Sequence, residues 1–284
     1  MKMANIELHV HPFLENITPI NIVEVMKNRN IDVLAVEALD SSIFPHIAEQ
    51  AKRCYPRVVC DRAGIILPDN KYILNGREYS TKEGFHLLTI GYSMDDAVPE
   101  TEIRKIIDKG LENNALIIID HPFIDNEKTK TAGHISEDLE QELEKLCKEY
   151  SGQITLEWNG YCIPWMRRML KMGLNVFGFG IRYHDVNKKA ENLSNLLMKQ
   201  GYNVPIVADT DLHARTKRHL QHMGTSRIIT DVSKGTPAEV VDSMRKNIFE
   251  GNYTNIKRYV TMFHLLEAFC IPIIFPKYFR RPRA

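Results

Sequence analysis

The chain has 284 residues, of which 44% are hydrophobic and 26% charged, enough for one large domain or two small ones with a sizeable core. The formal net charge is +1 at pH 7, so no strong electrostatic field favours nucleic acid or a membrane surface as partner. The five cysteines show no CxxC spacing, and no secretory segment precedes the first predicted strand, so we expect reduced thiols in a cytoplasmic protein.

Short strand-like runs alternate with helical patterns along most of the chain. The predicted strands, in chain order, are residues 6–10, 33–36, 72–74, 85–90, 116–119, 154–157, 176–179 and 204–207. The predicted helices are residues 19–27, 42–53, 100–112, 137–150, 164–172, 191–200 and 237–249. Thr18 and Thr236 are placed as helix caps, each followed by a proline at the first helical position. The turn-rich stretch 76–84 suggests a β-hairpin.

This alternation predicts a parallel-rich α/β fold, and about seven or eight strands favour a barrel over an open sheet. An open sheet normally shows a glycine-rich phosphate turn after its first strand, whereas this strand ends in His9-Val10-His11-Pro12. We expect one barrel domain over residues 1–250. Residues 251–284 are expected to pack on the barrel or, less favoured, on a partner subunit. Their apolar stretch is broken by His264, Glu267 and two prolines, so no membrane span is expected.

Histidines and carboxylates follow the predicted strands one after another. His9 and His11 are two residues apart at the end of a strand, so both project from the same face. Later strand ends carry Glu78, His86, His121, Asp211 and His213. In a barrel these ends lie on one rim, where active sites are found. Each residue alone has a simpler explanation, such as a helix cap for Asp211 or a loop charge for Glu78, and only the joint pattern indicates a metal site.

The motifs resemble those of the PHP family, named for the polymerase and histidinol phosphatase proteins. The matching stretches occur in the family's order at residues 7–11, 75–78, 85–91, 119–122, 156–159 and 208–213. The resemblance covers roughly residues 4 to 215. It implies a distorted (β/α)7 TIM-like barrel that holds up to three metal ions and hydrolyses phosphate esters.

The resemblance also implies ligand sets. The ligands of the first metal would be His9, His11, Glu78 and Asp211. Glu78 would bridge to a second metal, whose other ligands would be His86 and His121, and His213 resembles a ligand of the third. The shell of nitrogen and oxygen ligands suits zinc, manganese or iron(II).

One stretch departs from the family pattern. Where the family usually has Thr-Asp-His after the second strand, this chain places Ala38 and Leu39, which cannot bind a metal. We therefore favour a site with two ions. The alternative is that a ligand is supplied from a shifted position by Asp40, Glu15 or His46.

Two ions about 3.5–4 Å apart could acidify a water, orient a phosphate and offset charge on the attacking and leaving oxygens. His213, if it is not a ligand, could protonate the leaving group. Arg77, Arg182 and Arg215 are candidates to hold the substrate phosphate, although such an arginine is more often a solvated surface charge. Asn159 could face the site or only end its strand.

The resulting prediction is a metal-dependent phosphoesterase acting on a small phosphomonoester, a nucleotide or a nucleic-acid end. A basic stretch at residues 280–283 could touch a nucleic-acid backbone, but such tails are usually solvated. Two alternatives remain. The first is a non-catalytic, metal-stabilised module, which the Ala38-Leu39 replacement favours. The second is an amidohydrolase-like enzyme that cleaves a C–N bond on a similar metal rim.

Overall fold

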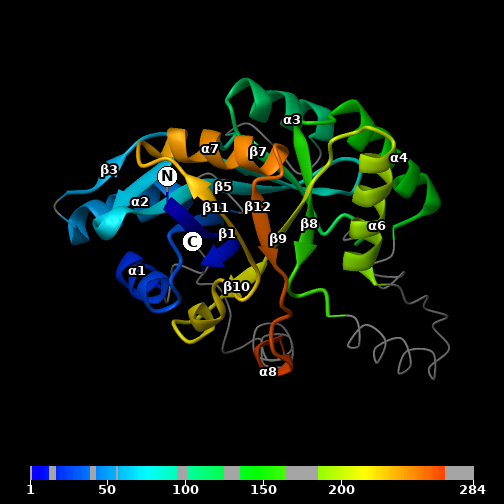
Figure 1. Ribbon diagram of the computed structural model, residues 1–284. Coiled ribbons are helices and arrows are strands. Elements are labelled where there is room, and N and C mark those ends of the chain that lie inside the picture. Colours follow the sequence, from blue (N-terminus) through cyan, green and yellow to red (C-terminus); the bar gives the residue numbers. More distant parts are fainter. Residues whose placement is uncertain are drawn as a thin grey trace.

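The computed structural model describes residues 2–12, 17–38, 43–55, 57–94, 101–124, 135–163 and 185–265 (Figure 1). The strands are β1 (Lys2–Pro12), β2 (Val33–Ala38), β3 (Val59–Cys60), β4 (Gly64–Leu67), β5 (Lys71–Ser80), β6 (His86–Ile90), β7 (Leu116–Asp120), β8 (Ile154–Asn159), β9 (Ile206–Asp209), β10 (Leu212–Ala214), β11 (Arg227–Val232) and β12 (Tyr253–Ile256). The helices are α1 (Pro19–Asn28), α2 (Ile43–Cys54), α3 (Ile103–Glu112), α4 (Glu137–Glu149), α6 (Val186–Lys199), α7 (Pro237–Phe249) and α8 (Met262–Leu265), with 3-10 turns η1 (Pro68–Asn70) and η3 (His219–His222).

The sheet is a nearly closed barrel with the strand order β12-β11-β1-β2-β5-β6-β7-β8-β9. Neighbours β1/β2, β2/β5, β7/β8 and β8/β9 are parallel, whereas β6 runs antiparallel to both β5 and β7. Side chains of β12, at one end of this strand order, form hydrogen bonds with β9, at the other end. Asn255 and Tyr253 donate hydrogen bonds to the carbonyl of Ile206 on β9, at 2.9 and 2.7 Å. The protein therefore has the distorted TIM-like α/β barrel that the sequence predicts.

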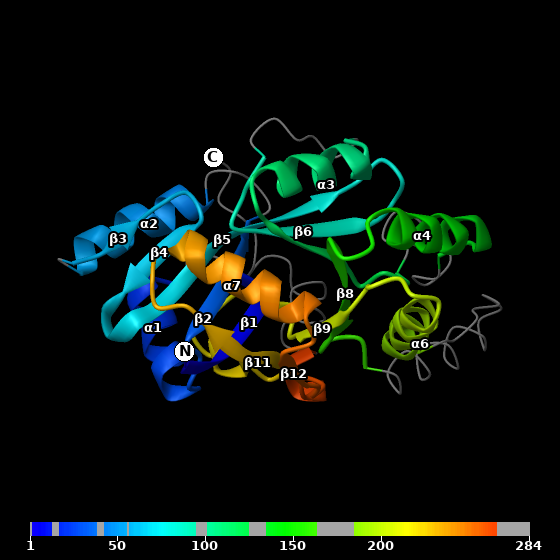
Figure 2. The ribbon, with the colours of Figure 1, turned by 45° about the horizontal axis from the view of Figure 1, so that its top comes forward.

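Helix α7 covers the end of the barrel at which the parallel strands begin, and Figure 2 shows it crossing in front of them. Its apolar face, with Val240, Met244 and Ile248, packs against inward-facing side chains such as Leu8 and Ile118. Helices α1 and α2 cover one side of the barrel, and α3, α4 and α6 cover the other (Figure 2). This packing leaves the opposite end of the barrel, where β1, β2, β7, β8 and β9 finish, to carry polar side chains.

The cap predictions are confirmed. The side chain of Thr18 accepts from the backbone N–H of Asn21, and that of Thr236 accepts from Glu239, each as part of a capping box. Helix α6 starts five residues before its predicted start because Asp185 caps it by accepting from the N–H of Lys188. The predicted helix 164–172 and strand 176–179 lie outside the described residues.

The predicted hairpin exists, but its turn is shorter than the sequence suggested. Strand β5 continues to Ser80 and pairs with β6, so that Glu78 faces Leu88 within the ladder rather than lying in a turn. The strands β3, β4, β10, β11 and β12 were not predicted. Strand β12, in the expected C-terminal extension, adds an edge to the barrel sheet by pairing with β11.

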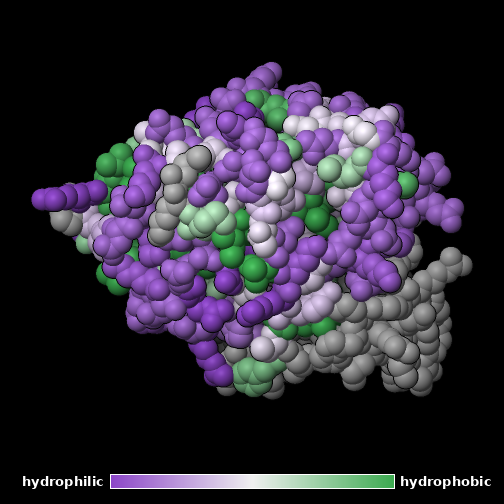
Figure 3. All heavy atoms as spheres, viewed as in Figure 1, coloured by the Kyte–Doolittle hydropathy of each residue, from purple (hydrophilic) through white to green (hydrophobic). Residues whose placement is uncertain are grey.

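Most of the surface seen in Figure 3 is hydrophilic, with apolar side chains in small separate groups. The large apolar side chains that are most exposed are Met3, Ile20, Val59, Leu196, Met198, Tyr259 and Phe263. Within the described part of the chain, no helix combines the length and the apolar character needed to cross a membrane.

Candidate metal centre

The barrel brings together, at the ends of its parallel strands, every residue that the sequence singled out as a metal ligand. His9 and His11 are on β1, Glu78 is on β5, His86 opens β6, His121 follows β7, and Asp211 and His213 lie at β10. Among the described residues, three overlapping groups place nitrogen and carboxylate atoms within 4.8 Å of one another. They are Glu78/His86/Asp120/His121, His9/His11/Asp211 and His9/Asp120/Glu157.

The group His9/His11/Asp211 centres on two facing imidazoles. Nε2 of His9 lies 2.8 Å from Nε2 of His11 and 3.5 Å from Oδ1 of Asp211. The other ring nitrogens are already engaged, because Nδ1 of His9 faces Glu157 at 2.8 Å and Nδ1 of His11 faces the carbonyl of Glu37 at 3.1 Å. If each Nδ1–H donates to its oxygen, two Nε2 lone pairs point at each other. A cation at this position removes the repulsion, so the donor set fits a metal ion.

Glu78 lies between the two groups of nitrogens. Its Oε2 is 3.3 Å from Nε2 of His11, while its Oε1 contacts Nδ1 of His86. Burial raises the pKa of Glu78, but the hydrogen bond from His86 and the electrostatic effect of the nearby histidines outweigh burial and lower it well below the usual value. An ionised carboxylate with one oxygen toward each group is the arrangement that two cations can share.

The group Glu78/His86/Asp120/His121 contains Asp120, which the sequence interpretation did not assign. Oδ2 of Asp120 is 2.9 Å from Nε2 of His121, the next residue. Successive side chains of a strand face opposite ways, but the backbone of His121 has φ +26° and leaves the strand, so both side chains reach the rim. The adjacency of Asp120 and His121 was visible in the sequence. The turn that points both the same way was not.

Buried carboxylates surround the outer nitrogen of His9. Besides Glu157, Oδ1 of Asp120 and Oδ1 of Asp209 lie 3.6 and 3.9 Å from Nδ1 of His9. Burial and the charge of Glu157 raise the pKa of Asp120 and of Asp209 well above the usual value, whereas hydrogen bonds from Asp120 and His9 offset burial and lower that of Glu157. Glu157 therefore holds a negative charge more readily than Asp120 or Asp209 does.

The two facing histidines differ in their affinity for a proton. Burial lowers the pKa of His9, but the charges of Asp211 and Glu157 outweigh it and raise the pKa to about 10. Burial, together with the charges of His213 and His9, lowers the pKa of His11 to about 3. The pair thus holds one positive charge, at the position where the metal-ligand geometry calls for a cation.

Two further buried residues position the rim. Glu7 accepts hydrogen bonds from the backbone N–H groups of Thr210 and Gly224, at 2.9 and 2.8 Å, and from the hydroxyl of Thr210. These bonds fix the loop that presents Asp211. Asn159 faces the site, since its amide donates to Oε2 of Glu157 and Oδ2 of Asp211, both at 2.9 Å.

Glu37, near the end of β2, is another buried acidic residue to which the sequence analysis assigned no role. It is 1% exposed, and neither carboxylate oxygen has a hydrogen-bond donor among the described residues. Burial raises its pKa well above the usual value, against a smaller opposite effect of His9. It faces Gly76 on β5, where an added Cβ would collide with its carboxylate. The sequence comparison placed the expected ligand after β2 at residues 38–40, one to three positions later than Glu37.

The three arginines predicted to bind phosphate do not share one position relative to the metal rim. Arg77 lies on the face of β5 opposite Glu78, where its guanidinium donates to the carbonyl of Met94 and covers the ring of Tyr79 at 4.9 Å. The structure does not bring it to the metal rim. Arg215 follows β10, is half-buried, and donates its backbone N–H to Nδ1 of His219 at 3.2 Å. Arg182 lies outside the described residues.

The alternative ligands for a third ion find no support among the described residues. His46 is exposed on α2, where it contacts Gln50. Asp40 and Glu15 lie outside the described residues. His213 stacks on His11, with ring centroids 4.7 Å apart, and its Nε2 is 3.2 Å from Oδ1 of Asp211.

No protein-family model and no curated protein matches the sequence. Solved structures share the fold. PsfC of Pseudomonas syringae PB-5123 aligns over 99% of this chain and 100% of its own, with 13% identity and a TM-score of 0.57. A two-domain protein of Bacteroides vulgatus ATCC 8482, described as containing a predicted PHP-like metal-dependent phosphoesterase, aligns over 94% and 70%, with 10% identity and a TM-score of 0.53.

The lesion-specific endonuclease PfuEndoQ of Pyrococcus furiosus aligns over 89% of this chain and 58% of its own, with 14% identity and a TM-score of 0.52. At such identities the likeness establishes the fold. The class to which fold and rim together point is a distorted TIM-like barrel with clustered histidines and carboxylates at the ends of its strands.

Proposed function

We propose that this protein is a metal-dependent phosphoesterase of the PHP type that holds two divalent ions at the barrel rim. The observation that carries the proposal is the position of Glu78, whose two carboxylate oxygens face His11 on one side and His86 on the other. The names of two fold relatives, a PHP-like phosphoesterase and an endonuclease, support the same reaction class.

The residues that would hold the ions are those with converging donor atoms. His9, His11, Asp211 and one oxygen of Glu78 would hold the first ion, and the other oxygen of Glu78 with His86, His121 and Asp120 would hold the second. Such nitrogen and carboxylate donors suit zinc, manganese or iron(II). When bound, a pair of divalent ions supplies Lewis acidity toward a water and a phosphoryl oxygen.

The chain's own residues orient these ligands. Glu157 and the carbonyl of Glu37 hold His9 and His11 with Nε2 toward the centre, and Asn159 fixes Asp211. The side chain of His213 is 24% exposed and lies next to Asp211, so it can hold a proton within reach of a substrate that enters from solvent. We assign His213 the role of general acid toward the leaving group.

The substrate class is a phosphate ester: a small phosphomonoester, a nucleotide or a nucleic-acid end. This chain spans 58% of the length of the endonuclease, so nucleic acid is one class among those to be tested. The second candidate is a non-catalytic, metal-stabilised module. It is supported by Ala38 and Leu39, which stand where the PHP family usually has metal-binding residues.

The test combines elemental analysis of protein purified without chelator with a screen of phosphomonoesters, nucleotides and short oligonucleotides. We expect two bound ions and metal-dependent phosphate release, which Asp211→Ala abolishes and the surface control Glu49→Gln retains. Bound metal without turnover would support the non-catalytic module. Cleavage of amides instead of phosphate esters would support the amidohydrolase alternative.

A further inference from the structure

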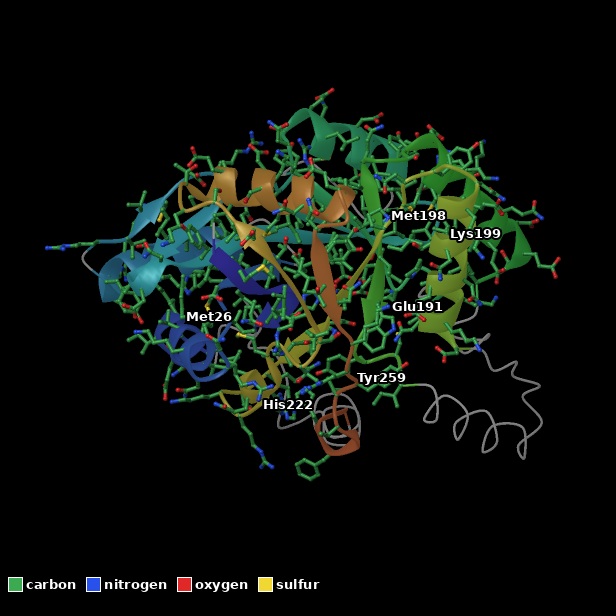
Figure 4. All side chains as sticks on the ribbon, viewed as in Figure 1. Met26, Glu191, Met198, Lys199, His222 and Tyr259 are labelled. Atoms are coloured by element: carbon green, nitrogen blue, oxygen red, sulfur yellow. The ribbon has the colours of Figure 1, made fainter. Side chains whose placement is uncertain are left out.

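A second group of histidines lies beside the metal rim and has no part in the site described above. His219 and His222 are in η3, and His264 is in α8, more than forty residues later in the chain. The ring of His264 is tilted by 32° against that of His222, with centroids 3.8 Å apart, and meets that of His219 edge-on at 5.3 Å. Figure 4 labels His222 close to α8, at the end of the barrel where the parallel strands finish.

Tyr161 connects this group to the metal rim. Its ring centroid is 5.5 Å from that of His264 and 6.1 Å from that of His213, which contacts Asp211. The backbone N–H of His213 donates to the phenol oxygen of Tyr161, and the same oxygen contacts Nε2 of His264. A phenol oxygen can accept one hydrogen bond and donate another at the same time, so the O–H of Tyr161 can donate to Nε2 of His264.

The direction of this hydrogen bond sets which nitrogen of His264 carries the proton. With Tyr161 as the donor, the neutral imidazole has its N–H at Nδ1. His264 is fully buried, and its Nδ1 has no hydrogen-bond partner among the described residues. A buried donor without an acceptor costs about 1–3 kcal/mol. An unpaired buried polar group in a native fold needs an explanation. For Nδ1 of His264, beside the metal rim, we take the explanation to be a hydrogen-bond acceptor supplied by a ligand.

The surroundings of His264 favour an acceptor that is negatively charged. Its electrostatic neighbours are His222, His219 and His213, none of which carries negative charge. The guanidinium of Arg218 lies over the ring of Phe263, next in sequence to His264, at 5.2 Å. The rings next to His264 are thus imidazoles rather than carboxylates, while Asp211 of the rim acts on Tyr161. Phosphate oxygens are strong acceptors for imidazole N–H donors.

We propose that Tyr161, His219, His222 and His264 form a subsite that receives a phosphate group of the substrate beside the metal ions, with Nδ1–H of His264 as its buried donor. This inference rests on the proposed function, because only a phosphoesterase would make the bound phosphate part of a substrate. Tyr161 is a positioning residue, because it acts through His264. A substrate with a second phosphate, or with two linked phosphates, would use both the metal ions and this subsite.

The test uses inorganic phosphate and the full-length protein after chelation, so that neither metal ions nor turnover contribute. Imidazole ¹H–¹⁵N spectra follow a phosphate titration. We expect the Nδ1–H signal of His264 to shift in a saturable way. His264→Phe should weaken phosphate binding by about 10- to 100-fold, the range for one hydrogen bond to a charged group. His46→Phe, which alters an exposed histidine on α2, is the matched control and should bind as wild type does.

Tyr161→Phe keeps the ring and removes only the hydroxyl that orients His264. It should weaken phosphate binding less than His264→Phe and should change the Nδ1/Nε2 tautomer signature of His264, which a merely structural loss would not. Equal phosphate affinity in wild type and in both folded variants would overturn the proposal. So would a titration that perturbs only the histidines of the metal rim. An inactive enzyme that nevertheless binds phosphate at His264 would contradict the proposed function and leave the subsite in place.

Discussion

Nδ1 of His9, on the first strand of the barrel, is 2.8 Å from Oε1 of Glu157, on a strand 148 residues later in the chain. The same carboxylate accepts from the backbone N–H of His121 at 2.7 Å through its other oxygen. Glu157 thus holds one ligand of each proposed ion. Carboxylates in this position orient metal-binding histidines and raise their basicity.

Glu157→Gln should therefore weaken metal binding although it removes no ligand. The amide of glutamine presents an NH2 group either to His9 or to the donors of His121 and Asn159, which breaks at least one hydrogen bond. We expect metal affinity to fall by about 10- to 100-fold, measured by competition with a coloured chelator. Glu49→Gln, at an exposed ion pair with Arg53 on α2, is the control and should keep the wild-type affinity. Unchanged affinity in Glu157→Gln would contradict the orienting role.

Glu78→Gln should lose both ions and the activity. The amide offers no charge for two cations to share, and its NH2 group would face either His11 or His86. Elemental analysis should give close to two ions per chain for wild type. Full activity in the variant would contradict the proposal that Glu78 binds both ions. Three full equivalents in wild type would show that a third ligand set exists despite Ala38 and Leu39.

His213→Ala and Asp211→Ala should separate a general acid from a ligand. In a site with two ions His213 is not a ligand, so its removal should keep both ions and lower turnover by about 10²–10⁴-fold. The loss should shrink for p-nitrophenyl phosphate, whose leaving group needs little protonation. Asp211→Ala should empty the first ion's site. A His213 variant that loses metal, or that is impaired equally on good and poor leaving groups, would contradict this assignment.

Gly76→Ala should destabilise the fold because of one buried carboxylate. A Cβ at residue 76 would collide with the carboxylate of Glu37 on the neighbouring strand. We expect a loss of about 1–3 kcal/mol in the free energy of unfolding, the usual cost of overpacking, measured with urea on chelated protein. In a Glu37→Ala background the same change should cost much less. An equal cost in both backgrounds would show that Glu37 is not the obstacle.

The thiol of Cys147 on α4 should resist alkylation in the folded protein. Burial raises its pKa to about 12, so it stays protonated at pH 8–9. Because the folded-state pKa lies above the unfolded one, this contribution to stability is complete below about pH 9 and is lost as pH rises toward 12. Maleimide labelling with peptide mapping should modify the exposed Cys54 rapidly and Cys147 only on unfolding. Comparable labelling rates would contradict the burial of Cys147.

The sequence by itself determined the barrel and most of the rim. Hydrophobic periodicity placed the main strands and helices, and the capping residues Thr18 and Thr236 marked helix starts, because these signals are local in the chain. The spacing of His9 and His11 put both on one face for the same reason. Short strands such as β10 and β12 escaped notice because three or four residues carry too little periodicity.

Only the tertiary structure decided what surrounds those ligands. The pairing of His9 with Glu157, the direction of Arg77 away from the rim, and the contact of Tyr161 with His264 depend on strand register and on packing between distant segments. Alternation along β5 allowed either Arg77 or Glu78 to face inward, and pairing with β2 and β6 selected Glu78. Local pattern specifies which residues share a face. Long-range contacts specify what that face meets.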